Sequence, residues 1–294
     1  MLHGWIILDK PLGLGSTTAV SAVKRILRQA GEPKTKVGHG GTLDPLATGV
    51  LPIALGEATK LCGRMLDASK QYEFTIRFGE ETDTIDAEGE TLTTSDVRPT
   101  RAETKAALPR FTGEIEQVPP AYSALKIDGK AAYARARAGE QVRMKSRKTT
   151  IFDLRLIEAT ADSAILSATV SKGTYIRALA RDISHALGTV GHVSYLRRTR
   201  AGPFSLEQAI SLDFLEEAAK ARALTRTVLP LTAALDDIPA LPVTPDQAKL
   251  LRHGQMLAGF PAKPGLGLAM LEETPVALVE ASADGLKVVR GFNL

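Results

Sequence analysis

The chain has 294 residues, enough for one large or two ordinary domains. Apolar residues make up 44% and charged residues 24%, which excludes a disordered chain and indicates a soluble, folded protein. The formal net charge of +4 permits a polyanionic partner without requiring one. The single cysteine, Cys62, excludes internal disulfides and cysteine-rich zinc sites, and it fits a reducing compartment.

The first apolar run, residues 5–8, is followed at once by Asp9, Lys10 and Pro11. It is too short for a signal peptide or a membrane span, so we expect a cytoplasmic protein that does not insert into a membrane. The run fits a short buried strand that ends in a loop rich in proline and glycine.

The central part of the chain alternates helix and strand patterns irregularly. Apolar residues at helical spacing predict a first helix with Ser16 as its N-cap. Period-two alternation predicts strands over 71–79 and 164–170, and helical spacing returns over 176–187. A capping box predicts another helix from Ser205. This irregular order favours an α+β fold over a doubly wound sheet.

The end of the chain predicts a second, smaller unit. Prolines punctuate the region near residue 238, and Thr244 is expected to cap a short helix. The segment 283–285 predicts a β-hairpin turn between two apolar strands. We therefore expect a large domain over residues 1–237 and a small β-rich domain over residues 238–294.

Charge is distributed unevenly along the chain. Residues 135–148 carry six basic side chains and one acidic one, a local charge of +5, whereas residues 80–90 carry six acidic side chains and no basic one. A basic run is most often a solvated surface. The alternative is an arm that lies along phosphates. A second basic cluster adds weight to that alternative: Arg197, Arg198 and Arg200.

The stretch KVGHGGTLDPLATG, residues 36–49, places Asp44 between a glycine-rich loop and a proline. A phosphate cradle would need Gly-Lys-Ser/Thr at the start of a helix, and a carboxylate would repel phosphate. A metal site would need more ligands than His39 and Asp44. A turn-forming aspartate is one remaining alternative. The flanking glycines, which let a ligand approach the backbone, favour a catalytic carboxylate, which a neighbouring cation would keep ionised.

Residues 37–60, VGHGGTLDPLATGVLPIALGEATK, resemble the catalytic motif of the TruB family, bacterial tRNA pseudouridine-55 synthases. Further blocks resemble the family in the same order: DKPLGLGS, TDTIDAEG, VPPAYSALKIDGKAAYARAR, SKGTYIRALARDI and YLRR. The resemblance implies an enzyme that isomerises uridine 55 in the T-loop of tRNA to pseudouridine, by base flipping and without cofactor or metal. It implies the T-arm of tRNA as partner, no required protein partner, and a monomer.

The resemblance also implies the residues of the site. Asp44 matches the essential aspartate, which acts either as a nucleophile at C1′ or as a base at C2′. Arg177 matches the arginine that pairs with it, although an exposed arginine in the first turn of a helix is the alternative. Tyr72 matches the tyrosine that stacks on the uracil, and Leu196 lines the same pocket; core packing is the alternative for both. His39 matches the histidine that fills the space left by the flipped base.

Supporting and binding residues follow from the same resemblance. Lys10 and Pro11 match the motif that supports the active-site loop. Arg143 and Arg147 fall in the family's mobile thumb loop, here about residues 120–148, which closes over the RNA. The implied fold is a pseudouridine-synthase-type catalytic domain around a mixed, mainly antiparallel sheet, followed by a small PUA-like RNA-binding domain.

The chain departs from the family pattern at Gly40, where a threonine is usual, and also at Gly15 and Ser184. Two rival functions stay open from the sequence. One is an RNA-binding helper that refolds tRNA, with the carboxylate incidental. The other is a guide-dependent synthase that acts on ribosomal RNA within a complex. The basic thumb loop argues against the second, because a free-standing enzyme needs its own grip on the RNA.

Overall fold

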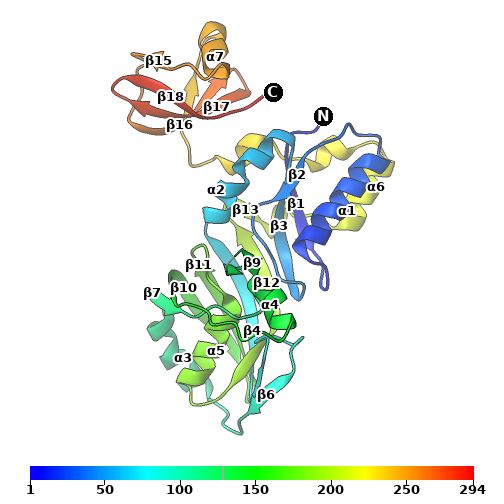
Figure 1. Ribbon diagram of the computed structural model, residues 1–294, viewed down its shortest axis with the longest axis vertical. Coiled ribbons are helices and arrows are strands. Elements are labelled where there is room, and N and C mark those ends of the chain that lie inside the picture. The colour runs from blue at the N-terminus through cyan, green and yellow to red at the C-terminus, as the bar shows by residue number, and fades with distance from the viewer. Residues whose placement is uncertain (128) are drawn as a thin grey trace.

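The computed structural model describes residues 1–127 and 129–294. A mixed sheet of nine strands forms its centre, and seven of them follow one another as β1-β3-β12-β4-β11-β10-β7 (Figure 1). β3 and β12 pair in parallel, and the other neighbours pair antiparallel. The predicted α+β fold with a mixed, mainly antiparallel sheet is therefore confirmed. The strands are β1 (Gly4–Lys10), β2 (Val37–His39), β3 (Ala47–Leu55), β4 (Lys70–Phe78), β7 (Gly113–Gln117), β10 (Arg147–Ala159), β11 (Ser163–Val170), β12 (Gly191–Ala201) and β13 (Phe204–Ser205).

The first strand shows why the centre of this sheet is apolar on both faces. Successive side chains of a strand point to opposite faces. Ile6 and Leu8 accordingly join one core cluster, while Trp5 and Ile7 join another on the opposite face. Burial on both sides explains why this strand reads as a continuous apolar run in the sequence.

Helices cover the first of these faces: α1 (Ser16–Gln29), α5 (Ile176–Ala186) and α6 (Leu212–Lys220). The first two match the predicted helices, but the predicted N-cap of α1, Ser16, is wrong. Gly15 is the N-cap of α1, and no side chain caps it. Ser205 and Gln208 form the predicted capping box, but it starts only a turn of 3-10 helix, η3 (Leu206–Gln208), before Ile210 exchanges backbone hydrogen bonds with β1. That strand pairing pulls the chain out of the helical conformation.

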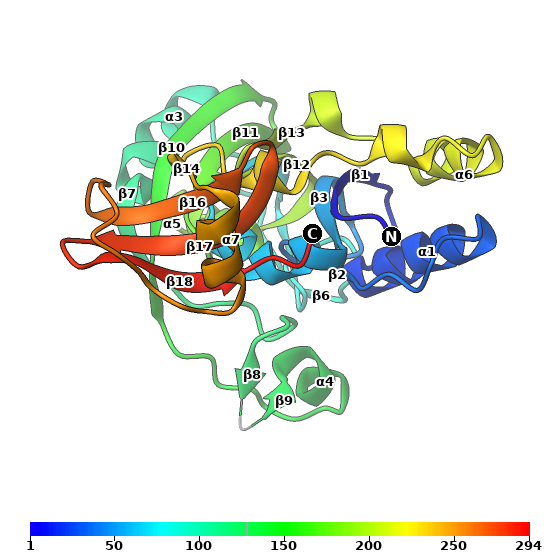
Figure 2. The same cartoon turned by 90° about the horizontal axis from the view of Figure 1, so that it is seen from above.

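The remaining elements of this part of the chain are short. They connect the strands of the sheet or pack at its edges: η1 (Gly56–Leu61), α2 (Cys62–Asp67), β5 (Glu80–Thr82), β6 (Thr91–Thr94), α3 (Arg101–Ala107), η2 (Leu108–Phe111), η4 (Leu224–Thr227) and η5 (Leu231–Ala234). The described residues of the thumb loop form a small hairpin and a helix that stand off the body of the molecule (Figure 2). These are β8 (Lys126–Ile127), β9 (Lys130–Ala131) and α4 (Ala132–Arg137).

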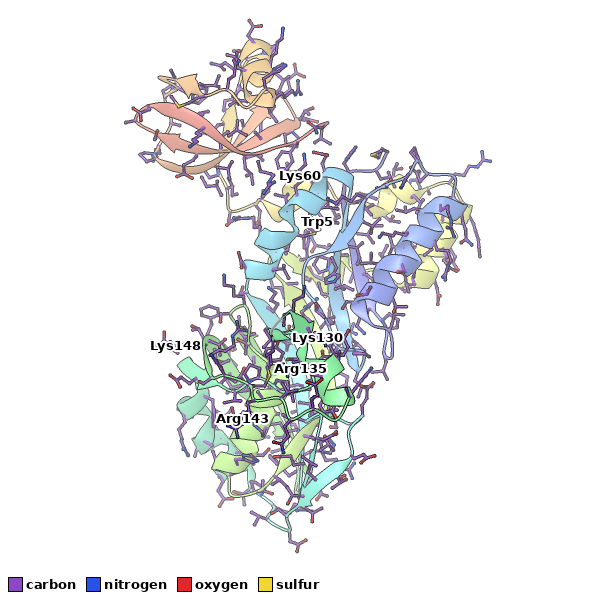
Figure 3. The ribbon with its side chains drawn as sticks, viewed as in Figure 1. Trp5, Lys60, Lys130, Arg135, Arg143 and Lys148 are labelled. Carbon is purple, nitrogen blue, oxygen red and sulfur yellow. The ribbon has the colours of Figure 1, made fainter. Side chains whose placement is uncertain are left out.

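The end of the chain forms a separate five-stranded sheet at one end of the molecule (Figure 1). Its elements are β14 (Ala240–Pro242), α7 (Pro245–Arg252), β15 (Leu257–Ala258), β16 (Gly265–Leu271), β17 (Thr274–Ser282) and β18 (Gly285–Gly291). Thr244 caps α7 through a capping box, as the sequence predicts, and the predicted hairpin joins β17 to β18. Phe292 packs in the same core cluster as Trp5, and Lys60 donates to the Gly291 carbonyl at 2.9 Å (Figure 3). The two sheets are thus held together.

No helix among the described residues is both long enough and apolar enough to cross a membrane.

Candidate active site

Asp44 lies on a loop between β2 and β3, and the first helix holds that loop in place. The Ser16 hydroxyl donates to the Leu43 carbonyl at 2.9 Å and accepts from the Leu43 N–H at 2.8 Å. All of these groups are buried, so both hydrogen bonds are shielded from water. The residue before Asp44 is therefore fixed from two directions. Ser16 is the first residue of α1 and not its N-cap, and its hydroxyl is engaged by Leu43 instead.

Arg198 braces the same loop from the sheet. Its guanidinium donates to the carbonyls of Val50 at 2.7 Å, Thr42 at 3.2 Å and Gly41 at 3.1 Å, and its side chain is buried. The sequence grouped it with Arg197 and Arg200 in a basic cluster that favoured binding of a polyanion. That interpretation is wrong for Arg198, because alternation along β12 turns it inward. The feature of the sequence that could have shown its burial is the alternation of a β-strand, in which neighbouring residues point to opposite faces.

Lys10 supports the loop that carries Asp44 through hydrogen bonds to backbone carbonyls. Its ammonium donates to the carbonyls of Pro11 at 2.9 Å, Leu14 at 2.6 Å and Pro45 at 3.3 Å. Burial lowers the pKa of Lys10 to about 8, and the nearby Asp44 charge opposes that shift. Pro11 is exposed beside it. Both residues lie at the base of the loop, and neither lines the cavity beside Asp44.

Arg177, at the start of α5, joins two carboxylates. Its guanidinium lies 2.8 Å from Asp44 Oδ2 and 3.2 Å from Asp86 Oδ2. It also donates to the carbonyls of Thr84 at 2.8 Å and Tyr122 at 2.9 Å. The side chain of Arg177 is 5% exposed and that of Asp86 9%, whereas that of Asp44 is 39% exposed. Asp44 is therefore the member of this group that a substrate can reach.

The sequence did not single out Asp86. It belongs to the acidic segment 80–90 and to the block TDTIDAEG, where six carboxylates obscure the one that turns inward. The Asp86 carboxylate accepts from the Thr84 hydroxyl at 2.6 Å and from the Glu88 N–H at 3.1 Å. These bonds fold the segment into a turn that points one carboxylate at Arg177.

A cavity of about 290 Å³ opens beside the carboxylate. Its walls bring together four residues that the sequence had placed far apart: Asp44, Tyr72, Arg177 and Leu196. Ala124 and Leu125, from the thumb loop, close part of the same cavity. A small, mostly apolar space with one accessible carboxylate suits a single planar ring attached to a polar group.

Lys70 also lines this cavity, although its ammonium is engaged elsewhere. It donates to the carbonyls of Met65 at 2.9 Å, Leu66 at 2.6 Å and Ala68 at 2.6 Å, at the end of α2. Burial, and then the neighbouring Arg198 charge, lower the pKa of Lys70 to about 8. Lys70 thus fixes the end of α2 against the cavity.

The remaining predicted residues, His39, Arg143 and Arg147, lie outside the cavity wall. His39 is half-buried at the end of β2, where its Nδ1 accepts a long hydrogen bond of 3.4 Å from the Gly41 N–H. Burial, and then the Arg198 charge, lower the pKa of His39 below its usual range, which favours the neutral ring. Arg143 and Arg147 line an exposed groove of about 520 Å³ on the thumb loop. Figure 3 shows Arg143 among other basic side chains of that loop.

Among residues 1–127 and 129–294, no three histidine, cysteine, aspartate or glutamate side chains gather so that they could hold a metal ion.

Comparison with known proteins identifies the class of protein. A family model described as TruB family pseudouridylate synthase, N-terminal domain, matches residues 24–176, and one described as tRNA pseudouridylate synthase B C-terminal domain matches residues 177–236. A solved structure of an H/ACA RNP bound to a substrate RNA containing 2′-deoxyuridine has a similar fold. The two structures superpose with a TM-score of 0.75 and are 26% identical in sequence. The match covers 99% of this chain and 86% of the other. The family models and the similar fold define a pseudouridylate synthase.

Relatives of high identity narrow the class. The tRNA pseudouridine synthase B of Zymomonas mobilis is 61% identical over 99% of this chain and 96% of its own length. The enzyme of the same name from Novosphingobium aromaticivorans is 61% identical over 100% of this chain and 98% of its own. The chain belongs to the TruB family, as the sequence predicts, and is an enzyme.

Proposed function

We propose that this enzyme converts the uridine at position 55, in the T-loop of tRNA, to pseudouridine. The N1–C1′ bond breaks, the uracil rotates, and a C5–C1′ bond forms. The proton on C5 leaves and N1 gains one, so the product is an isomer of the substrate. The name tRNA pseudouridine synthase B, carried by relatives at 61% identity, supports tRNA as the substrate.

The observation that carries this proposal is the ion pair between Arg177 and Asp44 at the cavity wall, 2.8 Å long. Asp44 supplies the carboxylate that acts on the ribose, either as a nucleophile at C1′ or as a base at C2′. Arg177 orients it, because two backbone carbonyls and Asp86 leave the guanidinium little freedom to move. A charged pair held in this way needs little reorganisation when the reaction occurs.

Tyr72 and Leu196 hold the uracil in this proposal. Both line the cavity, and Tyr72 is half-buried at the end of β4 that faces Asp44. In this proposal the phenol ring stacks on the base, and its oxygen assists removal of the C5 proton. Stacking of this kind is tolerant of the rotation that the uracil undergoes between bond cleavage and bond formation.

The target base must leave its stack before it can enter the cavity, which costs a few kcal/mol. His39, next to the glycine-rich loop, fills the space that the base leaves. Its neutral ring can take the place of a base at low electrostatic cost. Arg143 and Arg147 bind phosphates of the RNA arm. Lys10 and Pro11 stabilise the conformation of the loop that carries Asp44.

The remaining assignments complete the proposal. Residues 1–237 act as the catalytic domain, and residues 238–294 act as a PUA-like domain that binds RNA. The enzyme works in the cytoplasm as a monomer, without a cofactor and without a required protein partner. The +4 net charge and the basic thumb loop support binding of RNA by the chain alone.

Tritium release from a T-arm stem-loop labelled at C5 of uridine tests this function. We expect the wild type to release tritium and Asp44→Asn to release none, while both bind the stem-loop with similar affinity. Asp44→Asn keeps the shape of the side chain and removes its charge. Release by Asp44→Asn at the wild-type rate would contradict the role of the carboxylate. Absence of release by the wild type from stem-loop and whole tRNA alike would contradict the substrate.

A further inference from the structure

A second basic groove lies away from the cavity and the thumb loop. It runs between the end of α1 and the segment that leads into β2, and its volume is about 880 Å³. Leu27, Pro33 and Val37 contribute an apolar floor. Four basic side chains, all exposed, surround that floor: Lys24, Arg28, Lys34 and Lys36. We call this the α1 groove.

The charges of the α1 groove are not neutralised by the protein. Within the described part of the chain, none of the four basic residues forms an ion pair, and Glu32 is the one acid that lines the groove. The neighbouring Arg25 on the same helix differs, because it pairs with Glu216 of α6 at 3.4 Å. Four cations against one carboxylate leave the groove strongly positive. Unpaired cations around an apolar floor suit the phosphates and the sugar or base of a nucleic acid strand.

The α1 groove has a fixed relation to the active site. The first residue of α1, Ser16, is hydrogen-bonded to the loop that carries Asp44. The helix has 14 residues, so its other end lies about 20 Å away at 1.5 Å per residue. The two ribbon views place α1, β2 and the thumb loop on the same side of the molecule (Figures 1 and 2). An RNA that crosses this side can contact both basic regions.

We propose that the α1 groove binds phosphates of a tRNA strand that lies outside the stem-loop entering the cavity. This inference rests on the proposed function, because it takes tRNA as the substrate. In this inference, a stem-loop whose target base sits in the cavity and whose backbone follows the thumb loop does not extend to the far end of α1. Only a larger RNA, folded so that a second strand lies near the loop, reaches both regions. The groove then discriminates whole tRNA from an isolated arm.

The double variant Arg28→Ala/Lys34→Ala tests this inference, with Lys105→Ala/Arg110→Ala as a control that removes two exposed charges elsewhere. Binding of whole tRNA and of the isolated T-arm stem-loop is measured at several salt concentrations. We expect the groove variant to bind whole tRNA about tenfold more weakly at about 0.1 M salt, with the slope of log K against log salt smaller by roughly 1 to 2. Binding of the stem-loop and tritium release from it should stay at the wild-type level.

Three results would overturn the inference: unchanged affinity for whole tRNA, an equal loss for tRNA and stem-loop, or the same loss in the control variant. An equal loss would make the groove part of the surface that binds the arm. The failure of the proposed function looks different, because the wild type itself would then release no tritium from the stem-loop or from whole tRNA. The affinity comparison remains informative in that case, since it does not depend on turnover.

Discussion

The Ser16 hydroxyl and the Leu43 backbone form a reciprocal pair of hydrogen bonds, 2.9 Å and 2.8 Å long, that ties the first helix to the loop carrying Asp44. One short side chain satisfies both the N–H and the carbonyl of the residue before the carboxylate. Gly40 and Gly41 contribute no side chains that could hold the loop, so its conformation depends on this contact together with those of Arg198 and Lys10.

Ser16→Ala should therefore impair both stability and catalysis. It leaves the buried N–H and carbonyl of Leu43 without a partner, which costs about 1–3 kcal/mol of unfolding free energy. We expect the turnover rate to fall about tenfold or more, because Asp44 loses its position while the substrate contacts remain. Urea unfolding and tritium release measure the two effects. Ser21→Ala, an exposed serine on the same helix, is the control and should change neither.

The glycine at position 40, where the family usually has threonine, is explained by the close approach of Met65. A Cβ added at Gly40 would lie 2.7 Å from the Met65 Cβ, closer than such atoms approach, and 3.2 Å from its Cγ, which is a tight contact. Gly40→Ala should thus lower the unfolding free energy by about 1–3 kcal/mol. Combined with Met65→Gly, it should cost less than the sum of the two single changes, as urea unfolding would show. Gly63→Ala, on α2 with open space around it, is the control.

Much of the site could be predicted because its motifs are local. Asp44 follows a glycine-rich loop, so it stood out in a short stretch of sequence. Tyr72 was singled out by the family motif alone, because alternation along its strand fits core packing equally well. The roles of Ser16, Asp86 and Arg198 could not be predicted, because they depend on partners distant in the chain. A serine before a helix normally caps it, and an arginine in a basic cluster is normally exposed. In each case a contact across the fold overrode the local preference.

Lys10 should make the free energy of unfolding depend on pH. Its pKa is about 8 in the folded protein against 10.5 ordinarily, and burial is the main cause. Between these values the unfolded chain holds a proton that the folded chain has released, so this lysine makes the free energy of unfolding rise with pH. We expect the difference between wild type and Lys10→Met to grow in favour of the wild type by about 1–2 kcal/mol from about pH 7.5 to about pH 9.5.

Urea unfolding at the two pH values measures this difference. Lys105→Met, which removes an exposed lysine from α3, should show no such change and is the control. A difference that stays constant or shrinks as the pH rises would contradict the prediction.

Arg198 is expected to act through the position of the loop. Its guanidinium reaches three carbonyls at once, and a lysine ammonium cannot match that geometry. Arg198→Lys should lower kcat about tenfold or more and change the affinity for tRNA less than about threefold. Arg200→Lys, an exposed arginine on the same strand, is the control. An equal loss of affinity would indicate that Arg198 contacts the RNA instead.

Replacing Arg143 or Arg147 should have the opposite effect to replacing Arg198: the affinity for RNA should fall while turnover stays unchanged. Both are exposed on the groove of the thumb loop, away from the carboxylate. Replacing either with alanine should weaken binding of the T-arm stem-loop and reduce the slope of log K against log salt by about 1, because each arginine that binds a phosphate displaces a counterion. Turnover at saturating substrate should stay close to the wild type. Arg155→Ala removes an exposed charge from the same strand as Arg147 and should leave affinity unchanged. If the thumb-loop variants bind RNA as tightly as this control, the groove takes no part in holding the substrate.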